Sequence, residues 1–328
     1  MKALGLSLGA FGLCAAMMLA GCGQSQPTIQ TPQVAPQGTP LPPKPTGIRP
    51  AGWLSPQAGS GGALIYVAYY SASEVLVYPE AGGEPVGEIT DGVSAPYGLY
   101  VDQTGTLYVA NRTSNTVTAY PAGSTSLSNS WSQDLNSPLY PIVDSNGDLF
   151  VGNSGNGTIV EYQPGSTNAY KVLQTAGSEV DGMDFDSKGN LYVAYRTGSE
   201  KREAAIEEFA PGTTQGTVLI TKMSAPQGLI VDSSGNILVV ETTGKTSGLD
   251  LFPPKHKKPS KVIAAPFGDA LTQLAIEANE SELFASAIYD EWGVFTIAYP
   301  FSPSGTLSEL IQTPSVIEGV AISNGQTF

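Results

Sequence analysis

Histidine and cysteine are nearly absent from this 328-residue chain, and basic residues are scarce. With one histidine and two cysteines, the chain offers almost nothing from which to build a zinc cluster or a serine–histidine catalytic pair. Lysine and arginine number 15 against 29 aspartates and glutamates, so the formal net charge is −14. A surface with that charge repels phosphate backbones, and we expect no nucleic-acid partner.

Charge of either sign is also sparse. Charged residues make up 13% of the chain, well below the usual share of about a quarter. Glycine (38) and proline (25) are abundant instead, and such a composition is typical of an all-β protein with many turns. The length allows one large domain or two ordinary ones.

The first residues, "MKALGLSLGAFGLCAAMMLAGCGQ", have the layout of a secretory signal. A single basic residue, Lys2, precedes an apolar run that ends in small residues. The run is too short and too lightly flanked by charge to favour a membrane-spanning helix. We therefore predict a signal peptide over residues 1–21.

The end of this segment, "LAGC", resembles the lipobox of bacterial lipoproteins. The resemblance implies cleavage before Cys22 and a lipid anchor on that cysteine; the alternative is an ordinary buried or cleaved cysteine. Cys14 leaves with the signal, so the mature chain has no disulfide. In the related lipoproteins, an aspartate after the lipidated cysteine favours inner-membrane retention. Gly23 stands there instead, and we expect an exported, membrane-anchored lipoprotein at the outer membrane or cell surface.

Residues 22–62 are rich in proline, glutamine, threonine and glycine and show no strand period. Such a segment buries too little apolar surface to offset the entropy of ordering it. We predict an extended, flexible tether that holds the following domain away from a membrane surface.

One phrase recurs along the rest of the chain, from "GLYVDQTGTLYVAN" at Gly98 to "GLIVDSSGNILVVE" at Gly228. Its aspartate position is occupied in turn by Asp102, Asp144, Asp186, Asp232, Glu277 and Ser323, in steps of 42, 42, 46, 45 and 46 residues. Each unit contains four strand-like pieces, many of them mostly apolar. Periods of about 40 to 50 residues with several short strands indicate propeller blades.

The two ends of the repeat region complete one another. The chain ends on a first strand, "EGVAISNGQTF", with no second strand after it. The domain begins at Ala63 with "ALIYVAYYSASEVLVYPE", which supplies a second and a third strand without a first. Joined, these pieces make one blade and remove the open sheet edges. We predict an all-β, six-bladed β-propeller of four-stranded blades over residues 63–328.

The repeated aspartates and glycines are predicted to be turn residues. In "VDQTG" and its counterparts the aspartate can bond its own turn backbone, and the glycine can adopt a positive φ. A metal-binding role for these aspartates is the weaker hypothesis, because the turn already explains their recurrence.

The pattern "P-x-G-L-x-V-D-x-x-G-x-L-Y-V-A-N" resembles NHL-repeat propellers and the related lactonase-like bacterial propellers. The resemblance covers about residues 63–328 and implies the fold. That fold hosts enzymes, binding modules and scaffolds alike, so function depends on where the units differ.

The units differ where the first strands begin and the second strands end, at the predicted mouth of the central channel. The polar residues aligned there are Asp181, Glu241, Glu318, Asn111, Asn153 and Gln227. Oxygen ligands of this kind suit Ca²⁺ or Mg²⁺, and the lactonase-like resemblance implies a divalent cation at this place. The alternative is a solvated polar channel, since Asp181 and Glu318 lie three units apart in a ring of six.

Three consecutive units carry longer loops between the second and third strands, which we expect to raise a wall beside the mouth. The candidate recognition residues on this rim are Trp292, Asp290, Glu291, Arg196, Lys201 and Arg202. Trp292 can stack on a sugar or anchor a partner protein, and packing over a blade edge explains it equally well.

Three functions remain: a binding module, a hydrolase and a purely structural surface lipoprotein. The favoured one is a monomeric binding module that recognises a partner protein or a glycan, with no catalytic residue assigned. The alternative is a divalent-metal-dependent lactonase- or lyase-like hydrolase that uses Asp181, Glu241 or Glu318. The single histidine, His256, is expected on the opposite face, which disfavours a lyase that needs a histidine at the channel.

Overall fold

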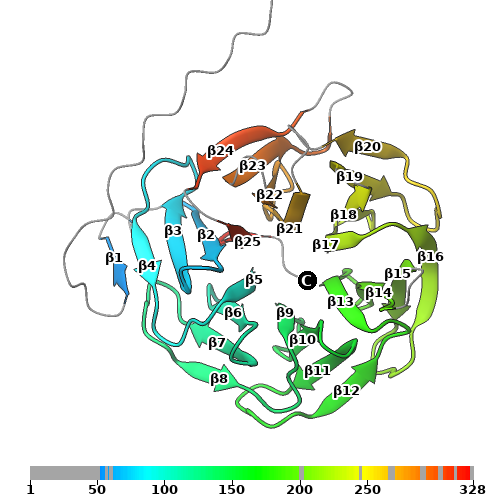
Figure 1. Cartoon of the computed structure of the whole chain (residues 1–328), viewed down its shortest axis with the longest axis horizontal. Coiled ribbons are helices and arrows are strands. Elements are labelled where there is room, and N and C mark those ends of the chain that lie inside the picture. The colour runs from blue at the N-terminus through cyan, green and yellow to red at the C-terminus, as the bar shows by residue number, and fades with distance from the viewer. Residues whose placement is uncertain are drawn as a thin grey trace, which may run out of the picture. The chain divides into compact units, whose positions relative to one another are not determined.

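Six antiparallel sheets surround a central axis in the computed structural model (Figure 1). The structure describes residues 52–55, 58, 62–198, 203–243, 246–264, 270–288, 293–301, 306–313 and 316–325. The predicted signal peptide, Cys22 and most of the predicted tether lie outside these residues. In the part of the chain that is described, no helix is long and apolar enough to cross a membrane.

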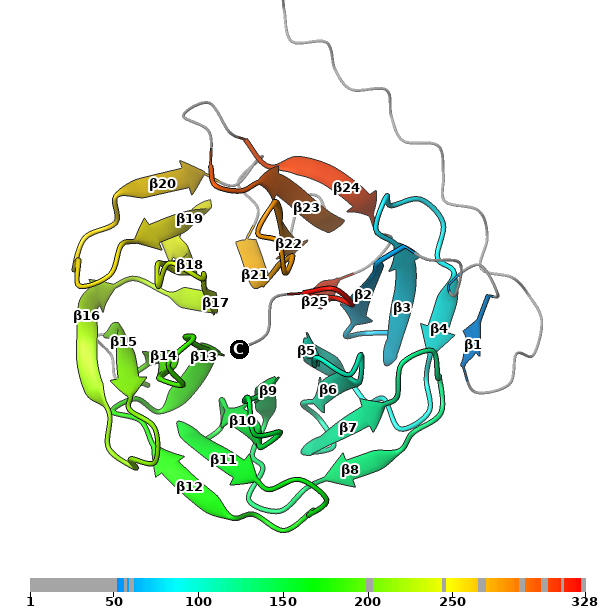
Figure 2. The ribbon, with the colours of Figure 1, turned by 180° about the vertical axis from the view of Figure 1, so that it is seen from behind.

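Each sheet is one blade, and its first strand lies nearest the axis (Figure 2). Blade 1 combines the last strand with the first ones: β25 (Ile317–Ile322), β2 (Leu64–Tyr69), β3 (Glu74–Pro79), β4 (Gly87–Ile89) and, outside β4, β1 (Trp53–Leu54). Blade 2 contains β5 (Pro96–Val101), β6 (Leu107–Asn111), β7 (Thr116–Tyr120) and β8 (Asn129–Trp131). Blade 3 contains β9 (Pro138–Val143), β10 (Leu149–Asn153), β11 (Thr158–Tyr162) and β12 (Lys171–Gln174).

The remaining blades follow the same order. Blade 4 contains β13 (Glu179–Phe185), β14 (Leu191–Arg196), β15 (Ala204–Phe209) and β16 (Thr217–Met223). Blade 5 contains β17 (Pro226–Val231), β18 (Ile237–Thr243), β19 (Thr246–Phe252) and β20 (Lys261–Ala264). Blade 6 contains β21 (Ala270–Ile276), β22 (Glu282–Ile288), β23 (Gly293–Ala298) and β24 (Ser308–Gln312). The six-bladed, four-stranded propeller predicted from the repeats is confirmed.

The ring closes in blade 1, as the two chain ends predicted. Strand β25 pairs antiparallel with β2, from Ile65 opposite Ile322 to Tyr69 opposite Ile317. Ser323, which occupies the repeat's aspartate position, accepts a hydrogen bond from the Leu64 N–H on its Oγ (2.8 Å). Strands β2 and β25 are therefore held together by a side-chain hydrogen bond as well as by ladder hydrogen bonds.

Strand β1 was not predicted, and its residues fall inside the segment assigned to the tether. Trp53 and Leu54 pair with Glu88 and Gly87 of β4, which makes blade 1 five-stranded. The Trp53 indole N–H donates to Glu88 Oε2 (3.1 Å), and Leu54 packs on the core between blades 1 and 2. Two residues are too few to show a strand period, so only the structure reveals this pairing.

The repeated aspartates build turns, as predicted. In four blades the aspartate Oδ1 accepts backbone N–H bonds from the residues two and four places ahead. The glycines inside these turns, such as Gly105 (φ 81°) and Gly235 (φ 79°), adopt the left-handed conformation. We call this side of the ring the turn face, and the side on which the first strands begin the entry face.

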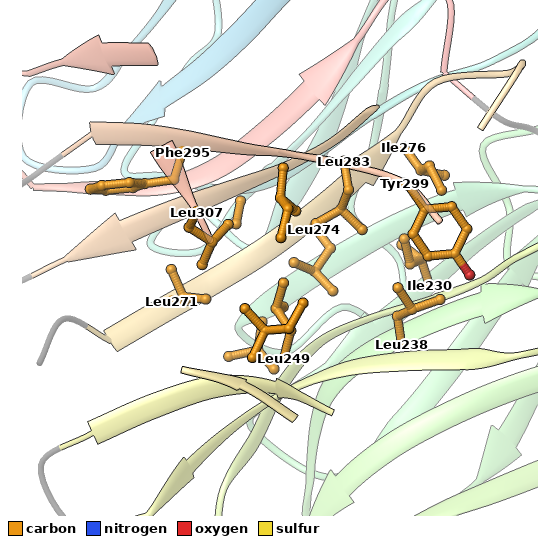
Figure 3. Packing of buried hydrophobic residues seen from close by; sticks show 14 of the residues in the cluster. Ile230, Leu238, Leu249, Leu271, Leu274, Ile276, Leu283, Phe295, Tyr299 and Leu307 are labelled. Atoms are coloured by element: carbon orange, nitrogen blue, oxygen red, sulfur yellow. The ribbon is translucent and has the colours of Figure 1, made fainter. Parts of the chain in front are cut away.

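Apolar side chains fill the gaps between neighbouring blades. Figure 3 shows the cluster between blades 5 and 6, where Leu238 and Leu249 meet Leu271 and Leu274. Because both faces of a blade pack against neighbours, its strands are apolar on both sides instead of alternating.

Glycines let the innermost strands approach one another around the axis. A Cβ on Gly98 would overlap the carbonyl oxygen of Leu139 on the next first strand, and Gly319 stands in the same relation to Tyr97. Gly182 and Gly228 repeat this contact in blades 4 and 5. The "P-x-G" of the repeat is thus a packing requirement of the ring.

We expect Gly98→Ala to lower the free energy of unfolding by about 1–3 kcal/mol, because the methyl group meets fixed backbone atoms. Gly62→Ala is the matched control, since nothing lies within 4 Å of a Cβ there. Urea denaturation of both variants measures the difference, and equal stability of the two would contradict the packing argument.

Candidate functional site

A β-bulge near the start of each first strand leaves one or two residues without a partner on the second strand. In all six blades the register between first and second strands shifts there, as between Pro96 and Leu99 of blade 2. The residues left without a ladder partner include Tyr97, Asp181, Gln227 and Glu318. Bulges commonly re-aim side chains, so the backbone itself collects these groups on the entry face.

Asp181 forms a buried ion pair with Arg196. The Arg196 Nε and Nη2 atoms donate to the two Asp181 oxygens at 2.6 and 2.5 Å, and Nη2 also lies 3.1 Å from Glu179 Oε2. The Asp181 side chain is 0% exposed and that of Arg196 is 23% exposed. Arg196, predicted as a rim residue, therefore points inward and occupies both carboxylate oxygens.

Burial and the ion pair have opposite effects on the pKa of Asp181. Burial raises the pKa of Asp181 to about 6, although the two hydrogen bonds and the charge of Arg196 oppose the rise. The same hydrogen bonds raise the pKa of Arg196 above its ordinary value. At neutral pH both groups are charged, and the pair is a fixed part of the mouth.

Two tyrosines lie beside this pair. The rings of Tyr97 and Tyr140 meet edge to face at 6.2 Å, and the Arg112 guanidinium lies 5.8 Å from the centre of the Tyr97 ring. Asp181 and Glu318 both raise the pKa of each tyrosine, after the larger effect of burial. The tyrosines thus occupy the space between two carboxylates that belong to blades three apart. We call Tyr97, Tyr140, Asp181, Arg196 and Glu318 the mouth cluster.

Glu318 and Tyr140 each present a buried polar atom to this cluster. Burial raises the pKa of Glu318 to about 7, while a hydrogen bond from Tyr97 and the charge of Arg112 lower it. Tyr140 is 4% exposed. Within the described part of the chain, the Tyr140 hydroxyl and Glu318 Oε2 make no hydrogen bond, which is unusual for buried polar atoms.

The other predicted ring members serve a different purpose. The side-chain oxygens at the ends of the second strands accept backbone N–H bonds from the loops that lead into the first strands. The pairs are Asn111 with Ser94 (2.9 Å), Asn153 with Asn136 (3.0 Å) and Glu241 with Ser224 (2.6 Å). In blade 4, Tyr195 stands at the corresponding position of β14, and Glu207 of β15 instead accepts from the Ala176 N–H (3.0 Å). These residues fasten loops inside the blades.

The structure therefore does not assemble the six predicted mouth residues into one ring. Glu241 also shares a hydrogen bond with Asp250, which together with burial raises the pKa of Asp250 to about 7. Gln227 is half-buried on the first strand of blade 5. Among the described residues, no group of three or more histidines, cysteines, aspartates or glutamates is arranged to hold a metal ion. Asp181 and Glu318 share the mouth, with the tyrosines between them.

The structure does not describe the remaining predicted rim residues. Trp292, Asp290, Glu291, Lys201 and Arg202 fall outside the described residues. Their assignment as a recognition rim stays a prediction.

In two blades another residue replaces the glycine of "P-x-G", and neither residue was predicted to be functional. Tyr140 stands there in blade 3 and Gln273 in blade 6. Gln273 Oε1 accepts from the N–H groups of Leu99 (3.0 Å) and Val320 (3.2 Å), and its Nε2 donates to Leu99 O (2.6 Å). This side chain ties the first strands of blades 6, 1 and 2 together. The signal in the sequence is the departure from glycine itself.

Below the mouth, the channel narrows to a cavity of about 60 Å³ that all six first strands line. Asp184 belongs to this lining, and its Oδ2 accepts from the Val231 N–H (2.8 Å). Burial raises the pKa of Asp184 to about 7, against the effect of its two backbone hydrogen bonds.

Solved structures support the architecture. A chain in the crystal structure of a nidogen/laminin complex matches with a TM-score of 0.61 and 16% identity, over 81% of this chain and 100% of that one. A chain of Kuenenia stuttgartiensis hydrazine synthase matches with a TM-score of 0.53 and 14% identity, over 65% of each chain. Such low identities show a shared fold alone. This chain is a six-bladed β-propeller.

No protein-family model matches the propeller sequence, and neither does any curated protein. The resemblance to NHL repeats and the lipoprotein signal therefore stay predictions from the sequence.

Replacement of Arg196 by methionine leaves the Asp181 carboxylate buried without its partner. We expect Arg196→Met to destabilise the propeller by about 3 kcal/mol in urea denaturation. The double variant Asp181→Leu with Arg196→Met restores at least half of that loss, because no buried charge remains. A loss below about 1 kcal/mol in the single variant would indicate an exposed, weak pair instead.

The stability of the propeller is expected to fall as pH rises from about 4 to 7. Folded Asp184 keeps its proton up to about pH 7, whereas an unfolded aspartate loses it near pH 4, so the folded state binds more protons between these values. Melting temperatures at pH 5 and pH 8 measure the difference. Asp184→Asn, which cannot ionise, reduces this difference by roughly 2–4 °C. An unchanged difference would show that Asp184 is ionised throughout.

Proposed function

We propose that the protein is an exported lipoprotein, anchored through Cys22, whose propeller acts as a recognition module and binds a glycan at the channel mouth. The lipobox-like "LAGC" and the tether-like segment after it support export and anchoring. The mouth cluster supports recognition, because it presents aromatic rings and polar atoms within a rigid ring of strands.

One observation carries the glycan proposal. The Tyr140 hydroxyl and Glu318 Oε2 both belong to the mouth cluster. Both atoms are buried and have no hydrogen-bond partner among the described residues. A hydroxyl group of a ligand can accept a hydrogen bond from the Tyr140 hydroxyl, and it can donate one to Glu318 Oε2. Satisfying two buried polar atoms is favourable, since each unsatisfied one costs about 1–3 kcal/mol.

The charges at the mouth favour a neutral ligand. Asp181 and Glu318 disfavour an anion, whereas Arg112 and Arg196 disfavour a cation. A sugar carries hydroxyl groups without net charge and packs well against tyrosine rings. Tyr97, which is half-buried, supplies such a ring.

The alternative is a divalent-metal-dependent hydrolase. Its strongest support is Glu318, whose pKa of about 7 suits a general acid or base. The engagement of both Asp181 oxygens by Arg196 disfavours it, because a metal ion would have to displace a bidentate guanidinium.

Calorimetric titration of the purified full-length chain in detergent with cellotriose, maltotriose and chitotriose tests the glycan proposal. We expect saturable binding of at least one sugar. Tyr140→Phe, which removes only the hydroxyl, weakens it about tenfold, equivalent to about 1.4 kcal/mol. Tyr108→Phe is the matched control, since the Tyr108 hydroxyl bonds to Asp102 at the turn face.

Absence of binding by all three sugars, or equal affinity of the Tyr140→Phe variant, would contradict the glycan proposal. Elemental analysis after dialysis against metal-free buffer and after calcium loading separates the alternative. One tightly held divalent ion per chain, lost in Asp181→Asn, would favour the hydrolase.

A further inference from the structure

A cleft opens on the turn face between blades 3 and 4, away from the mouth cluster. Its volume is about 610 Å³, within the range of pockets that bind ligands. Phe150 and Leu173 line it from blade 3, and Phe185 and Phe209 line it from blade 4. The Phe150 and Phe185 rings meet edge to face at 5.2 Å. We call this space the 3/4 cleft.

The corresponding gap between blades 2 and 3 is filled by a tryptophan. The Trp131 ring lies 5.9 Å from Tyr108 of its own blade and 6.4 Å from Tyr162 of blade 3. Its indole N–H donates to the carbonyl oxygen of Ser166 (2.8 Å), in the turn between the third and fourth strands of blade 3. An indole therefore fits between two blades of this propeller, with its polar atom satisfied.

Leu173 occupies the repeat position of Trp131. Trp131 pairs with Val117 on the third strand of its blade, and Leu173 pairs with Ile159 on the third strand of blade 3. Phe150 likewise stands in the place of Tyr108, since both are the second residues of their strands. The smaller leucine leaves open the space that Trp131 fills one blade earlier.

The far wall of the 3/4 cleft repeats the wall that receives Trp131. Phe209 ends the third strand of blade 4 as Tyr162 ends that of blade 3, opposite Leu191 and Leu149 respectively. Thr213 follows the positive-φ glycine of its turn as Ser166 does, and it lines the cleft. The aromatic wall and the carbonyl position that serve Trp131 are thus both present.

The rim of the cleft is acidic on the blade 3 side. Asp144, Asp148 and Glu161 line it there, and the Nζ of Lys171 lies 3.4 Å from Glu161 Oε2. Asp186 and Lys188 line the blade 4 side, so four carboxylates of the lining stand against two lysines. Glu161 is 7% exposed, and burial raises its pKa and that of Asp148 despite Lys171. A further cation at this rim would offset the cost of these carboxylates.

An exposed aromatic residue stands at the entrance. Tyr170 is 58% exposed and lies directly before Lys171, whose Nζ is 6.0 Å from the ring centre. Exposed tyrosines beside apolar pockets are frequent anchors in protein–protein interfaces. The apolar lining of the cleft suits an aromatic side chain, and its acidic rim suits a basic residue next to that side chain.

We propose that the 3/4 cleft binds a tryptophan side chain of a partner protein, flanked in that partner by a lysine or arginine. The indole takes the place that Trp131 occupies between blades 2 and 3, with its N–H directed to the carbonyl of Thr213. The basic neighbour meets the carboxylates of the blade 3 rim. This site is independent of the proposed glycan site, which lies on the entry face.

The test uses acetyl-Lys-Trp-Lys-amide and the full-length chain in detergent, with binding followed by calorimetry. We expect saturable binding, and no binding of the matched peptide acetyl-Lys-Ala-Lys-amide. Leu173→Trp fills the cleft from within and weakens binding at least tenfold. The gap between blades 2 and 3 shows that a tryptophan at this repeat position is accommodated, so the variant melts at or above the wild-type temperature.

Leu173→Met is the matched control, because it preserves side-chain volume and leaves the affinity within twofold. Glu161→Gln, which removes charge without changing shape, weakens binding at least threefold and serves as the second variant if Leu173→Trp fails to fold. Tyr140→Phe at the mouth leaves peptide binding within twofold. The proposal for the 3/4 cleft can therefore be refuted without refuting the glycan proposal, and the reverse also holds.

No binding of the tryptophan peptide, equal binding of the alanine peptide, or full affinity in both Leu173→Trp and Glu161→Gln would overturn the proposal. Binding of chitotriose that is lost on Leu173→Trp but kept in Tyr140→Phe would assign the cleft to a glycan and overturn it as well.

Discussion

The close approach of six first strands around one axis is the constraint on which the rest of this propeller depends. Neighbouring first strands come so near that a carbonyl oxygen of one occupies the space of a side chain on the next, and glycine is the residue that permits it at Gly98, Gly182, Gly228 and Gly319. The spacing of neighbouring first strands follows from this contact. The outer strands can vary because they diverge from the axis.

The polar character of the channel arises where that rule is broken. Tyr140 and Gln273 replace the glycine, and both line the narrow central cavity. The Gln273 side chain accepts hydrogen bonds from the backbones of two other first strands, so it helps to hold the ring of blades closed. Tyr140 finds no such partner among the described residues and leaves a hydroxyl facing Glu318 and Asp181. One departure is structural, and the other leaves the unpartnered hydroxyl on which the proposed glycan binding depends.

Sequence patterns predicted the blades, the aspartate turns and the closure of the ring, because each depends on short-range chemistry repeated several times. They did not predict that Asn111 and Asn153 fasten loops, since alignment places a residue on a strand but does not show which neighbour its side chain meets. Arg196 was predicted on the rim for the same reason, although the buried carboxylate of Asp181 draws it inward. The 3/4 cleft depends on a difference in side-chain size between Trp131 and Leu173, which only packing reveals.

Strand β1 gives blade 1 a mechanical asymmetry. It adds two residues to the outer edge of the sheet, with Trp53 and Leu54 paired to β4, whereas five residues of β2 are paired to β25 near the axis. A force applied to the chain ahead of Trp53 therefore acts first on the shortest ladder in the blade. Because the longer β2–β25 ladder closes the ring, we expect the β1–β4 ladder to open under force before the ring does.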